Sequence, residues 1–127
     1  MQPAKTFEDL IIWQMARILA KQVFELSSEE KFSKNWPLRD QIRKASGSIM
    51  DNIAEGFERD GKKELIQFLS VAKGSCGEVR SQLYRAYDLG YLDSVQLENL
   101  KNHIRQIEGG ITRMIQGLNR AEWQKRK

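Results

Sequence analysis

Residues 65–86 have the sequence LIQFLSVAKGSCGEVRSQLYRA, and this stretch decides the fold class. Its apolar residues follow one another at spacings of 4, 3, 4, 3, 4 and 3, which places them on one face of an α-helix. Such a long stripe predicts a helix over 62–89 that packs against neighbouring helices. The stripe consists of Leu65, Leu69, Ala72, Cys76, Val79, Leu83 and Ala86.

The same pattern continues outward on both sides of this stretch. It predicts three further helices, over 7–26, 37–58 and 94–119. The connections between the last three helices are short, so these helices must run in alternating directions. We therefore expect an all-α fold, an antiparallel four-helix bundle that forms a single domain over 1–127 and ends in a basic tail at 120–127.

Several residues mark where these helices begin and end. Pro37 suits the first turn of a helix, where its missing N–H costs nothing, and Gly90 suits a C-terminal cap. Asp93 and Gln96 have the spacing of a capping box at the start of the last helix. The polar segment 27–35 is expected to be a loop.

Small residues gather at two places inside the predicted helices. Residues 74–77 are Gly-Ser-Cys-Gly, and Gly109 and Gly110 lie in the last helix. A helical glycine costs about 1 kcal/mol relative to alanine, so these positions need a compensating reason. Close approach of another helix and a local kink are both possible for Gly109 and Gly110, and the sequence leaves the choice open.

Composition and charge limit the class of protein. The chain has 127 residues, 40% of them hydrophobic and 30% charged, which is typical of a globular domain. Its uncharged runs, such as 10–16 and 65–72, are much shorter than the roughly 20 residues of a membrane span, and no secretory signal is visible. Cys76 is the only cysteine, which excludes an internal disulfide. We expect a cytoplasmic protein without membrane association.

Basic residues form two clusters in a chain of net charge +4. Both are candidates for binding nucleic acid, although a solvated helix face and an ordinary charged terminus are equally good explanations. The candidate residues are Lys31, Lys34, Arg39, Arg43 and Lys44 in the first cluster, and Arg120, Lys125, Arg126 and Lys127 in the second.

Polar residues share one face of the second predicted helix, beside its apolar stripe. In an antiparallel hairpin with the third helix, Gln41 would lie level with Glu78, and Glu55 level with Glu64. Buried polar groups usually find partners and so fix helix register, which favours a structural role over a binding site. We call Gln41, Ser48, Asn52, Glu55 and Glu78 the polar ladder.

Four aromatic residues lie off or beside the apolar stripes. A bundle of this size cannot easily cover all of them, and apolar surface left uncovered often forms a subunit interface. Scattered surface aromatics are the alternative. The candidate interface residues are Trp13, Trp36, Tyr84 and Tyr87.

Signals of catalysis are nearly absent. Cys76 lies on the core stripe and His103 beside the core position Ile104, so both are interpreted as structural or surface residues. One histidine and one cysteine do not make a zinc site, and no glycine-rich phosphate loop occurs. We expect no enzyme activity, no metal and no cofactor.

Residues 38–56, LRDQIRKASGSIMDNIAEG, closely resemble the signature of a known four-helix-bundle family. The family is named for proteins encoded in intervening sequences of bacterial large-subunit ribosomal RNA. Its other blocks resemble 7–14, 68–75 and 88–92, so that the resemblance covers about 7–118. Cys76 departs mildly from the family, where an aliphatic residue is commoner.

The resemblance implies a bacterial protein that assembles as a ring-like homopentamer with a central channel. A related branch, the accessory variability determinant of diversity-generating retroelements, associates with a reverse transcriptase and binds nucleic acid through basic surface. For the family at large no enzymatic activity is established and the molecular role is unknown. RNA, DNA and a protein partner are thus the candidate partners.

Two hypotheses follow for this chain. The first is a homo-oligomer that binds RNA or other nucleic acid, because several copies in a ring multiply weak phosphate contacts. The second is a self-assembling adaptor that binds other proteins and no nucleic acid. An enzyme with a carboxylate site around Glu55 is a third idea that rests on one residue.

Overall fold

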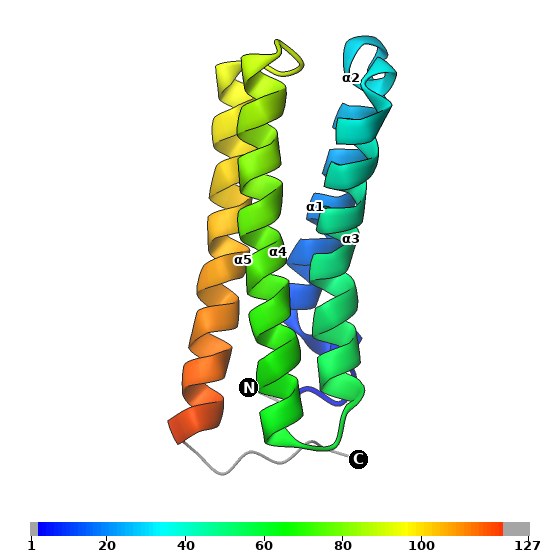
Figure 1. Cartoon of the computed structure of the whole chain (residues 1–127). Coiled ribbons are helices and arrows are strands. Elements are labelled where there is room, and N and C mark those ends of the chain that lie inside the picture. Colours follow the sequence, from blue (N-terminus) through cyan, green and yellow to red (C-terminus); the bar gives the residue numbers. More distant parts are fainter. Residues whose placement is uncertain (1–2, 121–127) are drawn as a thin grey trace.

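The computed structural model describes residues 3–120, and the regular secondary structure of this part is entirely helical. Four long helices lie side by side along one axis, with a short helix at one end of the bundle (Figure 1). The all-α prediction is confirmed. The elements are the 3₁₀-helix η1 (Phe7–Asp9) and the α-helices α1 (Ile11–Ser27), α2 (Glu30–Lys34), α3 (Trp36–Glu58), α4 (Lys62–Asp88) and α5 (Ser94–Arg120).

The core lies along the axis between the long helices. All seven residues of the stripe that predicted α4 are 0% exposed, because that face of α4 packs on its neighbours. α3 packs against α1 and α4, and α5 packs against α4 and more sparingly against α1. Within the described part of the chain, no helix has the length and apolar character needed to cross a membrane.

The structure corrects the expected loop at 27–35. Part of this segment forms α2, whose Phe32 is buried in the core. The Phe32 ring stacks on Tyr91, with the ring centroids 5.0 Å apart. One buried aromatic residue is therefore enough to fold a mostly polar segment onto the end of the bundle.

The first helix begins later than the predicted residue 7. The Asp9 carboxylate accepts hydrogen bonds from the backbone N–H groups of Lys5 and Thr6, at 3.0 and 3.2 Å. These bonds close the single turn η1, after which Leu10 is extended. The regular helix α1 then starts at Ile11.

The turn between α4 and α5 has the predicted caps. Gly90 has a φ of +80°, and the N–H of Tyr91 donates to the carbonyl of Ala86 at 2.9 Å, which satisfies the end of α4. Asp93 and Gln96 form the capping box reciprocally, each side chain accepting from the other's backbone N–H at 2.7 and 2.9 Å.

Close helix approach explains two of the glycines. A Cβ atom added at Gly110 would lie 2.5 Å from Cγ2 of Ile12 on α1, and one at Gly56 would lie 2.7 Å from Cβ of Phe68 on α4. Of the two reasons left open for the pair at 109–110, close approach of another helix therefore accounts for Gly110. At Gly74 and Gly77, an added Cβ atom would have no atom of the described residues within 4 Å outside its own stretch of helix.

Candidate functional site

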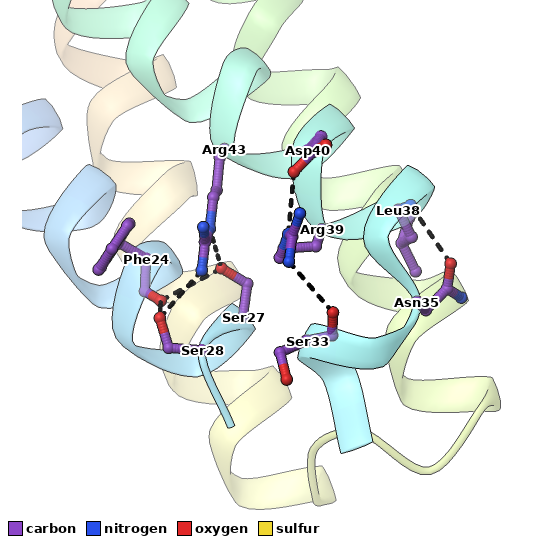
Figure 2. Close-up of polar contacts among 9 residues, drawn as sticks. All are labelled: Phe24, Ser27, Ser28, Ser33, Asn35, Leu38, Arg39, Asp40 and Arg43. Carbon is purple, nitrogen blue, oxygen red and sulfur yellow. Dashed lines mark hydrogen bonds and ion pairs between the residues drawn. The ribbon is translucent and has the colours of Figure 1, made fainter. Parts of the chain in front are cut away.

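The basic cluster at the start of α3 is largely engaged in holding the bundle together. The Arg43 guanidinium donates to the hydroxyls of Ser27 and Ser28 at 2.8 and 2.9 Å (Figure 2). It also lies 4.2 Å from the ring centroid of Phe24, a cation–π contact. Arg43 thereby links α3 to the end of α1 through two of its N–H donors.

Arg39 has a similar role between α2 and α3. Its Nε donates to the carboxylate of Asp40 at 2.9 Å, and its Nη1 donates to the backbone carbonyl of Ser33 at 3.3 Å (Figure 2). The carbonyl lies in α2, so the bond fastens this short helix to α3. The two arginines of the first basic cluster thus both have partners within the chain.

The lysines of the same cluster remain more available. Lys34 forms an exposed pair with Glu30 at 3.5 Å, which contributes little in water. Lys31 and Lys44 are exposed and form no ion pair with the residues that the structure describes. Three lysine ammonium groups are therefore available to an outside anion.

Of the second basic cluster, the structure describes Arg120 alone. Arg120 is exposed at the end of α5, far from α2 along the axis (Figure 1). Lys125, Arg126 and Lys127 lie outside the described residues. Within one chain, Arg120 and the first cluster do not form one continuous surface.

The hydrogen bonds of the polar ladder centre on Ser48. The Ser48 and Ser75 hydroxyls are 3.0 Å apart and bridge α3 to α4. The Asn52 amide donates to the Ser48 carbonyl and hydroxyl oxygens at 2.8 and 2.9 Å. Glu55, in contrast, accepts from Arg59 at 3.0 Å in an exposed ion pair.

The predicted register of the ladder is wrong by about one helical turn. Gln41 accepts from Arg85 at 3.3 Å rather than lying level with Glu78, and Ser48 faces Ser75. α3 ends and α4 begins at the predicted residues, so the difference comes from the relative stagger of the two packed helices. The α4 residues that bond to Gln41 and Ser48 therefore lie nearer the C-terminus than expected.

A groove with a volume of about 510 Å³ lies above this ladder, between α3 and α4. Gln82 lies on its wall, is only 7% exposed, and its Oε1 has no hydrogen-bond partner among the described residues. Sequence reasoning missed Gln82, although its position seven residues after Ser75 places both beside the apolar stripe. The groove is lined by Gln41, Lys44, Ala45, Ser48, Ser75, Glu78 and Gln82.

The candidate interface aromatics have different surroundings. Trp13 is half-buried and packs edge-on against Phe7 at 5.0 Å between ring centroids, so η1 partly covers it. Trp36 is 63% exposed, and Tyr84 and Tyr87 are also exposed, with the Lys101 ammonium 4.8 Å from the Tyr84 ring centroid.

Sequence reasoning also missed two exposed residues of α1. Ile11 is 66% exposed and Ile18 54% exposed. Half-buried Met15 lies between them at helical spacing. The signal was present in the sequence, because the three residues repeat the spacing of the core stripe on a neighbouring face of the same helix.

The two residues with reactive side chains have structural surroundings. Cys76 is buried, and this burial raises the pKa of its thiol to about 12, with a smaller contribution from the charge of Glu108. His103 Nδ1 lies 2.9 Å from Gln22 Oε1, and burial lowers the pKa of the imidazole. No group of three potential metal ligands occurs within residues 3–120.

Comparison with known proteins gives a family and a fold. A solved structure of a protein with unknown function from the S23 ribosomal protein family of Bacteroides thetaiotaomicron has a TM-score of 0.76. It is 19% identical and covers 83% of this chain and 98% of its own, which shows a shared fold. No curated protein matches the chain. The family described as 23S rRNA-intervening sequence protein matches residues 8–113, and the chain belongs to this family.

Proposed function

We propose that this protein is a non-enzymatic, cytoplasmic subunit of a homo-oligomer, a ring-like pentamer, whose assembled surface binds RNA. Its building block is an antiparallel four-helix bundle without a cofactor. Neither the family description nor that of the solved relative names a reaction. The observation that supports assembly best is the apolar surface that one chain leaves uncovered.

The uncovered surface is most regular on α1. Ile11, Met15 and Ile18 form a second apolar seam beside the core stripe, and both isoleucines are more than half exposed. Apolar side chains gathered in this way commonly form a contact between proteins. A second copy of the chain is the partner that we propose for this seam.

RNA binding is supported by the lysines that the fold leaves available. Because Arg39 and Arg43 are engaged inside the chain, one subunit offers few phosphate contacts, chiefly from Lys31, Lys34 and Lys44. Several subunits in one ring would raise the effective concentration of these lysines, so that RNA binds more tightly although each subunit makes no additional contact. DNA would use the same contacts.

Light scattering coupled to size-exclusion chromatography tests the assembly. We expect the mass of a pentamer for the wild type, and a mass near 14.8 kDa for Ile11→Lys/Ile18→Lys with its helicity retained. Gln67→Lys/Ser81→Lys adds the same charge on an exposed face of α4 and serves as the control. A monomeric wild type would refute the assembly, and an unchanged mass for the isoleucine variant would refute the seam.

A salt titration tests RNA binding. The logarithm of the association constant for a single strand should fall with the logarithm of salt concentration, by about 0.7 per phosphate contact. Fluorescence anisotropy of a labelled oligonucleotide gives this slope. An affinity that does not depend on salt would show that phosphate contacts are not the basis of binding.

The second candidate function is a protein-binding adaptor with no affinity for nucleic acid. It is favoured by the internal contacts of Arg39 and Arg43, which remove two cations from the predicted patch. Absence of RNA binding at low salt, together with recovery of a defined partner protein on pull-down, would support this function over the first.

A further inference from the structure

The groove between α3 and α4 contains a polar group that the fold leaves unsatisfied. The Gln82 amide is more than nine-tenths buried, and its Oε1 accepts no hydrogen bond from the described residues. A buried acceptor without a partner is costly, whereas a methionine of similar size at this position would carry no such cost. Because the terminal amide torsion is broad, a rotation can turn Oε1 toward the groove. The acceptor would then meet any O–H or N–H donor bound there.

The serine pair supplies a donor to the same groove. The Asn52 amide nitrogen can only donate, so the Ser48 hydroxyl oxygen accepts from it. Ser48 can then direct its own proton to Ser75, 3.0 Å away. In this chain of hydrogen bonds the Ser75 proton is left for an acceptor in the groove.

Charge at the groove favours a ligand with one anionic group. The Lys44 ammonium lies on its wall without an ion pair among the described residues, and the Arg85 guanidinium reaches Gln41 on the same wall. Glu78 is the one carboxylate among the lining residues, so one anionic group near Lys44 is favoured over several. The groove therefore suits an anion with a neighbouring hydroxyl group.

We infer that this groove binds a ribose–phosphate unit of RNA, with Lys44 at the phosphate and with Gln82 and Ser75 at the ribose hydroxyl. The 2′-hydroxyl both donates and accepts hydrogen bonds, as this pair of residues requires, and DNA lacks it. A volume of about 510 Å³ accommodates one nucleotide. The inference rests on the proposed RNA binding and adds the place where RNA is distinguished from DNA.

Anisotropy titrations with single-stranded oligo(U) and oligo(dU) of equal length test this assignment. The wild-type protein should bind oligo(U) about five- to tenfold more tightly, the ratio that one net hydrogen bond supplies. Gln82→Met should lower the affinity for oligo(U) to that for oligo(dU) and leave the latter unchanged. Gln67→Met, on the same helix but outside the groove, is the matched control and should keep the preference.

Two further variants separate the contributions of the groove. Ser75→Ala should reduce the preference for RNA, since it removes the donor but no charge. Lys44→Gln should weaken both oligonucleotides and lower the salt slope by about 0.7, while Lys73→Gln outside the groove leaves the slope unchanged. Circular dichroism melting confirms that each variant is folded before its binding is compared.

The outcomes distinguish this inference from the proposed function. Equal affinity of the wild type for RNA and DNA, or an undiminished preference in Gln82→Met, overturns the ribose assignment and leaves RNA binding in place. Failure of the wild type to bind either oligonucleotide overturns both. Competition by uridine monophosphate as effective per nucleotide as oligo(U) would identify a free nucleotide as the ligand and overturn the assignment to RNA.

Discussion

The two flanks of α3 differ in how they use their polar residues. On the flank facing α1 and α2, the guanidiniums of Arg39 and Arg43 direct their donors to partners in the same chain. On the flank facing α4, Lys44 has no ion pair with the described residues and the nearby Gln82 amide has a buried oxygen without a partner. Charge counted along a sequence is therefore a poor measure of charge available for binding.

The largest change in stability should come from a substitution on the flank of α3 that faces α1 and α2. Arg43→Ala removes two hydrogen bonds and the contact with Phe24, and leaves the fully buried Ser27 without its donor. We expect the free energy of unfolding to fall by about 2–3 kcal/mol, measured by urea denaturation. Unaltered RNA affinity would accompany this loss. A large drop in RNA affinity with unchanged stability would show that Arg43 serves binding rather than the fold.

Gln82→Met should change stability in the opposite direction and raise the free energy of unfolding. Replacing a buried acceptor that lacks a partner is expected to stabilise the free protein by about 1 kcal/mol, because the desolvation cost disappears. Thermal melting without RNA measures the change, with Gln67→Met as the exposed control on α4. A destabilised variant would mean that Gln82 is satisfied inside the chain and that the two flanks are alike.

Asn52→Leu tests whether the hydrogen bonds around Ser48, on the flank of α3 that faces α4, stabilise the bundle. The variant loses two hydrogen bonds to Ser48 but buries additional apolar surface, so we expect a net destabilisation of about 1 kcal/mol. Light scattering and melting should be measured together. A variant with wild-type stability and mass would argue against a register-fixing role for Asn52.

Lys34→Gln should change stability by less than about 0.5 kcal/mol, since its pair with Glu30 is exposed. If this lysine contacts phosphate, the variant should still lower the salt slope of RNA binding. Urea denaturation and anisotropy give the two values. A stability loss as large as that of Arg43→Ala would show that Lys34, like Arg39 and Arg43, holds the bundle together.

The smallest effect concerns pH and lies outside both flanks. Burial lowers the pKa of His103 below its ordinary value of 6.5, so the unfolded chain binds a proton first as pH falls. Stability should be constant well above pH 6.5 and decline slightly as pH falls through this value. His103→Gln should flatten this profile between about pH 8 and 5.5. An unchanged slope in the variant would assign the effect to another group.

The core of the bundle could be predicted because helical periodicity is a local property. The α4 stripe, the Gly90 cap and the Asp93–Gln96 capping box all follow from spacings within one turn or a few turns of chain. α2 was missed because its one buried residue, Phe32, is held by Tyr91 from a distant turn. No local pattern contains that contact.

The candidate site was predictable in its residue types but not in their partners. Ser48 and Asn52 were expected to be structural, and their contacts form the centre of the ladder. The register with α4 depended on how the two helices are staggered when they pack, and a shift of about one turn changed the cross-helix partners of Gln41 and Ser48. Whether an arginine such as Arg43 faces solvent or a neighbouring helix is also decided by packing.

The sequence by itself determined the four long helices, the buried stripe and the family, since each depends on patterns that are local in the chain. Only the tertiary structure decided that Arg39 and Arg43 have partners and that Gly110 lets α1 come close. It also decided that Gln82 Oε1, in the groove that Lys44 lines, has no hydrogen-bond partner among the described residues. These facts depend on distances between helices. Such distances result from the fit of all the side chains together, and no single segment specifies them.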